Sequence, residues 1–252
     1  MRVCTLLACL MLTPLPASAA PYTVFRDGET LLFRVSWGLF LHAGDIRISA
    51  HREVVEGRAA FRITMVTSSR GILRGFYPYD DRADALIDEA TGRIVSARDV
   101  GTADDKTASD TETLFDYTKR VATHTDKARP DRNHEFAIPA GDPVDLLSAL
   151  VATREWQAKA GDKRAALIYV GNDLYPVTLY AEGYDQVRTF QGDQRTLRLV
   201  PRMDTVEPRG IFKRGGEIKV WVSQDGDRQP VKMQLKLKFG TAMLTLMEHK
   251  VP

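Results

Sequence analysis

The sequence predicts a mainly β protein, built as a curved antiparallel sheet or a partly open β-barrel with one α-helix packed against it. The stretch from Gly216 to Lys250 alternates strictly between apolar and polar residues, which is the period of a half-buried strand. Alternating segments recur through the chain about every 8–12 residues, with turn residues between them. Only one stretch, which begins at Asp142, carries the apolar spacing of a helix.

The first strands are expected from the alternation after Phe25. Leu31, Phe33, Val35 and Trp37 share one face of a strand, and a turn or bulge follows. Further strands are expected around Ile46 and Ile48, from Ala59 to Met65, and as a hairpin of residues 83–88 and 93–100.

The middle of the chain is more polar and predicts a threonine-rich hairpin. Its strands run from Ala108 to Phe115 and from Arg120 to Thr125. Few of these residues are apolar, so the hairpin is expected to be exposed or to form an edge of the sheet.

One helix is predicted between Asp142 and Gly161. Asp142 can cap the first N–H groups, Pro143 suits the first turn, and Asp145 complements the helix dipole. Val144, Leu147, Leu150 and Val151 form an apolar stripe, and such a short helix needs the sheet to stabilise it.

Strands resume after the helix and continue to the end of the chain. Asp225-Gly226 is a strong turn signal, and Pro230 suits a strand start, where a missing N–H is tolerated. In the strand before this turn, Trp221 stands among the polar residues. The expected strands cover residues 165–170, 175–181, 184–190, 196–200, 217–223, 231–239 and 242–247.

Three stretches together resemble a family of secreted bacterial proteins, number 3108 of the domains of unknown function. They are the C-terminal Val-Trp-Val-Ser strand with the strand that ends at Phe239-Gly240, the opening Asp27–Gly38 followed by Ala43-Gly44, and the helix Asp145–Leu150 followed by Arg154. The resemblance covers nearly the whole mature chain. It implies the fold and an exported protein, and it implies no chemistry.

The N-terminus predicts export to the periplasm. Residues 1–19 have a basic start, an apolar segment and the Ala17-Ser18-Ala19 cleavage pattern of a signal peptide, which leaves residues 20–252 as a single β-rich domain. Both cysteines, Cys4 and Cys9, lie inside the signal, and the apolar run before Cys9 is too short for a lipoprotein signal. We therefore expect a protein without lipidation, disulfide or transmembrane segment.

Composition and motifs exclude several function classes. The chain has 35 basic and 33 acidic residues, a balance that does not suggest nucleic-acid binding. None of its five histidines has ligand spacing, and it lacks a Gly-x-Ser-x-Gly elbow, a phosphate loop and a dinucleotide fingerprint. We expect no enzyme activity, cofactor or metal. A hydrolase whose site leaves no motif is the weaker possibility.

Two glycine-containing loops combine apolar and cationic residues and are the candidate sites. Such loops suit a mouth that meets a lipid headgroup, a membrane surface or a protein partner. Alternatively, they tuck Phe76 and Phe212 into the end of a barrel. The candidate residues are Arg70, Ile72, Leu73, Arg74, Phe76 and Tyr77 in the first loop, and Arg209, Ile211, Phe212, Lys213 and Arg214 in the second.

These observations favour a non-enzymatic periplasmic protein that binds an apolar or amphipathic, lipid-like envelope ligand, with the two loops at its entrance. The alternative is an envelope scaffold or assembly partner that contacts another envelope protein through the hairpin of residues 108–125.

Overall fold

The computed structural model describes residues 22–104, 106–213, 216–237 and 240–252. The predicted signal peptide, both cysteines and Arg214 lie outside these ranges. The described chain forms one large, mostly antiparallel sheet of fifteen strands that is not closed, and two short α-helices accompany it. This confirms the predicted fold class.

The sheet consists of two meanders that join at its centre, where β1 (Thr30–Trp37) pairs with β15 (Gly240–Lys250). The first half continues outward through β2 (Phe40–Val55), β3 (Arg58–Ser69), β4 (Tyr79–Asp88), β5 (Ile94–Ala103), β6 (Lys106–Asp116), β7 (Val121–Asp126) and β8 (His134–Ala137). The second half continues through β14 (Pro230–Leu237), β13 (Glu217–Ser223), β12 (Gly192–Arg202), β11 (Asp173–Thr189), β10 (Lys163–Val170) and β9 (Val144–Asp145).

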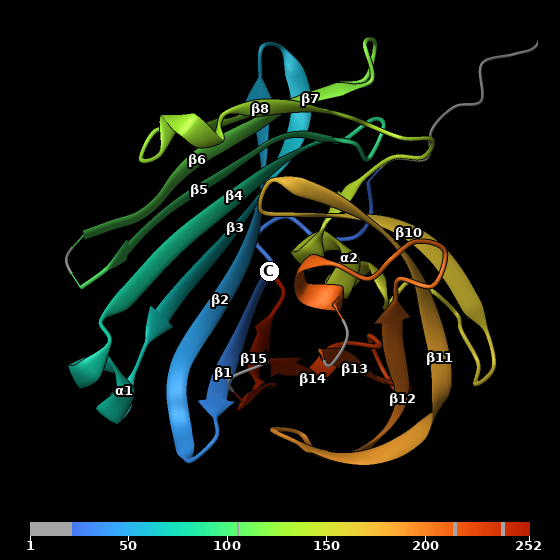
Figure 1. Cartoon of the computed structure of the whole chain (residues 1–252). Coiled ribbons are helices and arrows are strands. Elements are labelled where there is room, and N and C mark those ends of the chain that lie inside the picture. Colours follow the sequence, from blue (N-terminus) through green and yellow to red (C-terminus); the bar gives the residue numbers. More distant parts are fainter. Residues whose placement is uncertain (1–21, 105, 214–215, 238–239) are drawn as a thin grey trace, which may run out of the picture.

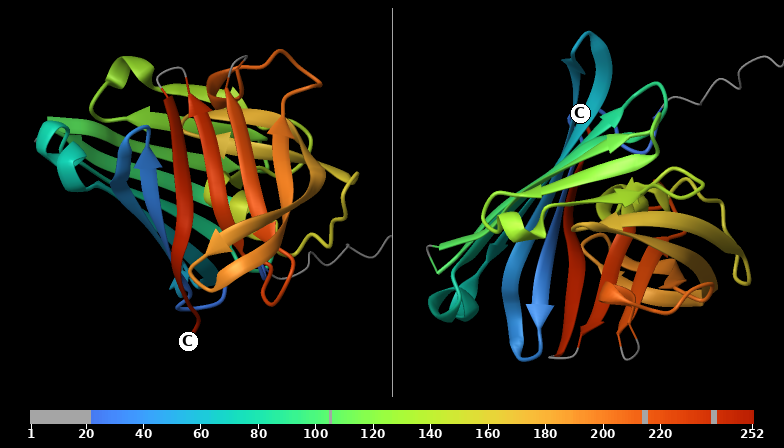
Figure 2. Two further views of the ribbon diagram at one scale, coloured as in Figure 1. Left: turned by 90° about the horizontal axis from the view of Figure 1, so that it is seen from below. Right: turned by 45° about the horizontal axis from the view of Figure 1, so that its top comes forward.

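The second half curls strongly, whereas the first half extends beside it as a broader sheet (Figures 1 and 2). The curl brings the two outer parts of the sheet together without a strand ladder. The Tyr169 hydroxyl on β10 donates to Thr113 Oγ1 on β6 at 2.8 Å, and Phe115 meets Tyr169 edge to face. The two meanders thus enclose a common interior although the sheet stays open.

Two α-helices occupy very different places. Helix α1 (Gly71–Phe76) projects from the end of the first half, and α2 (Leu146–Ala152) lies inside the curl of the second half (Figure 1). Two 3-10 turns, η1 (Pro130–Arg132) and η2 (Gly210–Phe212), complete the helical elements of the described chain. None of the helices in the described ranges is long and apolar enough to cross a bilayer.

Alternation along the strands builds the core, as the sequence predicts. Leu31 and Phe33 on β1 are fully buried, and Ile218, Val220 and Val222 on β13 face the same interior. The core then extends across both halves through large side chains, among them Ile48, Phe61, Ile63, Ile87, Ile94, Leu197, Leu199 and Leu246.

Helix α2 begins later and ends earlier than predicted. Its N-cap is Asp145, whose Oδ1 accepts hydrogen bonds from the backbone N–H groups of Leu147 at 3.0 Å and Ser148 at 2.9 Å. Asp142 instead forms ion pairs with Arg93 and Arg120. The prediction of Asp142 as the cap was wrong because Val144 and Asp145 first form β9 against β10.

We expect Asp145→Ala to lower the free energy of unfolding by about 1–2 kcal/mol, since both capping bonds are lost. Burial raises the pKa of Asp145 more than its hydrogen bonds lower it, so Asp145→Asn should keep most of the stability. Urea denaturation followed by circular dichroism measures both. Asp142→Ala is the matched control. An equal loss in that variant would contradict the assignment of the cap.

The hairpin of β6 and β7 is not the edge of the sheet, contrary to prediction. Strand β8 pairs with β7 from Val121 to His124 and takes the edge position. The threonine-rich strands also bury polar groups, because Thr113 Oγ1 and His124 Nδ1 lie 2.8 Å apart inside the sheet. Their hydroxyls satisfy buried partners, which explains polar residues in an interior strand.

Trp221 is buried, whereas the sequence places it on the polar face of β13. Its Nε1 donates to Asp185 at 2.7 Å, and the Lys232 ammonium lies 5.2 Å from its ring centroid. Cross-strand neighbours thus cover the outer face of β13, an effect that period-2 alternation alone does not reveal.

Candidate functional site

An apolar cavity of about 260 Å³ lies between α2 and the curled half of the sheet. Helix α2 supplies one wall, and strands β10, β11, β13 and β14 supply the others. Almost all side chains that reach the cavity are hydrocarbon, including Leu146, Leu150, Val177, Ile218, Val220 and Met233. Such a lining favours an apolar guest and offers little to water.

The position of α2 explains why this space persists. The helix is only seven residues long, and its first residues follow β9, which pairs with β10 at only Val144 and Asp145. Ala149 on the helix and Ala166 on β10 both line the cavity. These small side chains leave room that larger residues would fill.

The mouth of the cavity lies along the edge of β10. Residues 164–168 all line the cavity in sequence, and neighbouring strand residues point to opposite faces, so an edge of the strand borders it. Strand β10 pairs with β11 along its length but with β9 only at Ile168 and Tyr169. Within the described ranges, the edge at residues 163–167 therefore has no strand partner.

Arg164 and Asp142 are the charged residues at this mouth. The Arg164 side chain is exposed and forms no ion pair with any carboxylate of the described residues. Asp142 is already held by Arg93 at 3.0 Å and by Arg120 at 3.7 Å. The mouth therefore presents one uncompensated positive charge beside an apolar interior.

The second predicted loop contributes directly to the cavity. Phe212 on η2 lines it and packs on Tyr175 with ring centroids 5.5 Å apart. Arg209 lies over the same tyrosine ring and pairs with Asp173. Gly210 has φ +56, and a Cβ there would collide with Tyr175, so only glycine lets η2 lie this close to β11.

The remaining residues of this loop lie at its margins. Ile211 is half-buried and packs against the main core, whereas Lys213 is exposed. The predicted site residue Arg214 lies outside the described residues.

The first predicted loop is far from the cavity. It forms α1 at the end of the first half, where Arg70 pairs with Asp45 at 2.9 Å and Arg74 pairs with Asp80 at 2.7 Å (Figure 1). Leu73 is half-buried, and the side chains of Ile72, Phe76 and Tyr77 are exposed. The structure does not bring the two loops to one entrance, and Phe76 does not close the end of a barrel.

Sequence reasoning missed two residues of the cavity, Trp156 and Arg164. The helix was expected to continue to Gly161, which hid the turn after α2 that brings Trp156 to the cavity. Arg164 precedes an apolar strand, and a single arginine at such a place carries no recognisable signal. Only the distance of α2 from β10 shows its role.

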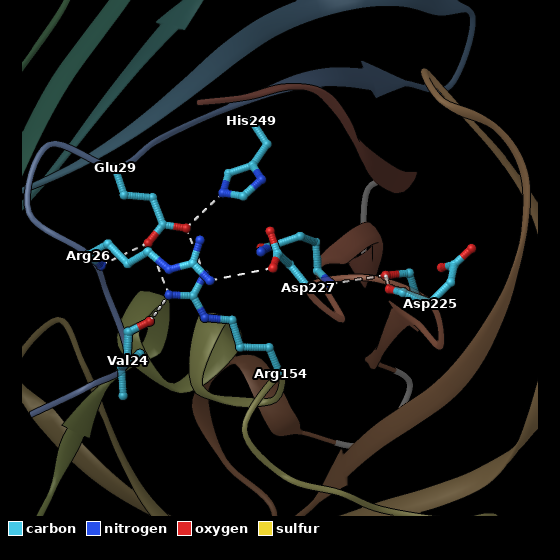
Figure 3. Close-up of polar contacts among 9 residues, drawn as sticks. Val24, Arg26, Glu29, Arg154, Asp225, Asp227 and His249 are labelled. Atoms are coloured by element: carbon cyan, nitrogen blue, oxygen red, sulfur yellow. Dashed lines mark hydrogen bonds and ion pairs between the residues drawn. The ribbon is translucent and has the colours of Figure 1, made fainter. Parts of the chain in front are cut away.

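A buried ionic cluster lies in the same half of the molecule. The Glu29 carboxylate, fully buried, accepts hydrogen bonds from Arg154 at 2.6 and 2.9 Å, from His249 at 2.8 Å and from the Arg26 N–H at 2.9 Å (Figure 3). Burial alone would raise the pKa of Glu29. The bonds from His249, Arg154 and Arg26 outweigh this effect and lower it to about 2.

This cluster has the properties of a structural ion pair. A general base works best with a pKa near the working pH, and Glu29 lies far below it. Both carboxylate oxygens already have donors, which leaves no site for a substrate proton. In the part of the chain that the structure describes, no three His, Cys, Asp or Glu side chains are grouped to hold a metal ion.

The fold and the cavity define a class of protein: an open, curled β-sheet that encloses a helix and an apolar pocket. The chain belongs to the DUF3108 family of proteins of unknown function, whose model matches residues 32–247. This confirms the resemblance that the sequence showed. No functionally curated protein matches the chain.

Solved structures show similarity at the level of the fold. A β-barrel-like protein of the DUF1849 domain of unknown function from Brucella abortus has a TM-score of 0.54 and 7% identity, and covers 94% of this chain and 100% of its own. A putative lipoprotein from Parabacteroides distasonis gives 0.34 and 10%, covering 89% and 96%. Lipoprotein LppX of Mycobacterium tuberculosis gives 0.25 and 12%, covering 90% and 88%.

Proposed function

We propose that this protein is a non-enzymatic envelope protein that binds the hydrocarbon chain of an amphipathic, lipid-like ligand in the cavity between α2 and the curled half of the sheet. The observation that carries the proposal is the cavity itself, about 260 Å³ and lined almost wholly by hydrocarbon. The predicted signal peptide supports a periplasmic location.

The size of the cavity limits the guest to one chain or ring. An apolar cavity of about 150 Å³ accepts benzene, and pockets for small ligands measure roughly 300–1,000 Å³. A cavity of about 260 Å³ lies between these sizes. The protein therefore takes a single acyl chain, and any further chain of a lipid stays outside.

The mouth indicates where the polar end of the ligand lies. Arg164 and the unpaired edge of β10 both border the opening, so an anionic head group there meets a guanidinium and free backbone groups. The alternative function, a scaffold that acts through the hairpin of residues 108–125, has less support because β8 already covers the edge of β7.

Binding of the neutral fluorescent probe N-phenyl-1-naphthylamine tests the proposal. We expect saturable enhancement with the wild-type protein, and dodecanoate should displace the probe. Ala149→Phe and Ala166→Phe fill the cavity from opposite walls and should weaken binding at least about tenfold, since overpacking costs about 1–3 kcal/mol. Arg164→Gln should weaken dodecanoate about fivefold and leave 1-dodecanol unchanged.

The control is Ala137→Phe, which adds the same ring to the exposed strand β8. Thermal melts show that each variant is folded. No probe binding by the wild type, or equal binding by both filled variants, would overturn the proposal.

A further inference from the structure

Two neighbouring loops at the end of the first half form a surface that the cavity does not use. We name it the apolar tip: residues 37–42 at the β1–β2 turn, and residues 70–77, which include α1. The Arg70 N–H donates to the Ala43 carbonyl at 2.8 Å, and the Arg70 guanidinium bonds to Asp45 on β2. These contacts fix the two loops side by side, and both project from the same end of the sheet (Figures 1 and 2).

The apolar tip exposes large hydrocarbon side chains to an unusual degree. The exposed fractions are 97% for Leu39, 83% for Leu41, 72% for Ile72 and 79% for Phe76. Single exposed apolar residues are ordinary on protein surfaces, but a contiguous group marks a site of interaction. None of these four side chains supports the core.

The chemistry of the apolar tip changes with depth. Trp37, Phe40 and Tyr77 are less exposed than the four outermost side chains, and so lie behind them. The ion pairs of Arg70 and Arg74 come next, while neither loop contains an acidic residue. Hydrocarbon outermost, then tryptophan and tyrosine, then arginine is the order that a membrane interface favours.

The small size of the apolar tip argues against a protein partner. A stable protein interface buries about 800 Å² on each side, whereas this surface comprises one turn and a six-residue helix. Two projecting loops suit insertion into a soft surface better than contact with a rigid one. We propose that the apolar tip docks this protein on a phospholipid membrane, with Leu39, Leu41, Ile72 and Phe76 inserted among the acyl chains.

Sedimentation with vesicles of phosphatidylethanolamine and phosphatidylglycerol tests the proposal. The wild-type protein should pellet with the vesicles. The double variant Leu39→Ser/Leu41→Ser should partition at least about tenfold less, because burial of each leucine contributes roughly that factor. Ile72→Ser/Phe76→Ser tests the second loop independently and should show a similar loss.

Trp37 gives a local signal of docking. It is the most exposed of the three tryptophans, and insertion should shift its emission to shorter wavelength. The control is Val54→Ser, which removes an equally exposed apolar side chain, 73% exposed, at the other end of β2. It should pellet like the wild type.

Three results would overturn the proposal. The wild type could stay in the supernatant, or both double variants could pellet as the wild type does. The third is a lipid-free dimer in analytical ultracentrifugation that the double variants abolish, which would assign the apolar tip to a second copy of the chain. None of these experiments depends on occupancy of the cavity.

Discussion

Replacement of Glu29 by leucine is expected to lower the free energy of unfolding by about 3–5 kcal/mol, because it leaves the Arg154 guanidinium buried without its counter-charge. The Glu29 carboxylate is fully buried, and the Arg154 side chain is nearly so. Their two hydrogen bonds join the N-terminal segment to the turn after α2 (Figure 3). Urea denaturation monitored by circular dichroism measures the loss.

The double variant Glu29→Leu/Arg154→Met separates the charge from the packing. Replacement of both partners by apolar side chains of similar volume is often nearly neutral, so the double variant should recover a large part of the loss. The control is Asp193→Ala, which breaks the exposed pair with Arg188 and should change stability by no more than about 0.5 kcal/mol. Equal effects of Glu29→Leu and Asp193→Ala would contradict the structural role of the cluster.

The same carboxylate gives a pH dependence with a definite sign. Because the pKa of Glu29 falls from 4.5 to about 2 on folding, the unfolded chain binds the proton more readily between these values. The stability that Glu29 contributes is thus complete above its ordinary pKa and is lost as the pH falls toward 2. The difference in stability between wild type and Glu29→Leu should therefore shrink on acidification from about pH 6 to about pH 3.

Phe33→Ala is expected to lower the free energy of unfolding by about 3–5 kcal/mol, since it opens a cavity at the centre of the core. Phe33 is fully buried on β1, where the two meanders meet, opposite Ile46 on β2 and Leu246 on β15. A loss there weakens both halves of the sheet at once. Thermal and urea unfolding provide the measurement.

Phe76→Ala is the control for Phe33→Ala, since it removes the same ring from the exposed face of α1. It should leave the unfolding midpoint within the error of the wild type. A loss in Phe76→Ala that approached the loss in Phe33→Ala would mean that α1 packs against the molecule more closely than the structure shows.

Strand positions were predictable because alternation acts locally. The segment of residues 217–223 was assigned with its observed bounds, and Pro230 begins β14 as expected. The order of strands was not predictable, since the pairing of β1 with β15 joins residues more than two hundred positions apart. The burial of Trp221 escaped for the same reason, because Asp185 and Lys232 come from other strands.

The candidate site was only partly predictable. Composition marked both loops, and the structure places Phe212 in the cavity and Phe76 in the apolar tip. Composition could not show that the loops lie apart, because their positions follow from the curl of the sheet. Arg164 and Ala149 acquire their roles through the distance between α2 and β10, which no sequence pattern encodes.

Mass spectrometry of an organic extract of the protein, purified from cell envelopes, tests the central proposal most directly. If the cavity binds a lipid-like chain, the wild-type extract should contain a single-chain or chain-bearing amphiphile in a fixed ratio to protein, and the extract of Ala149→Phe should contain far less. A wild-type extract without such a molecule, or equal amounts from both proteins, would contradict the account.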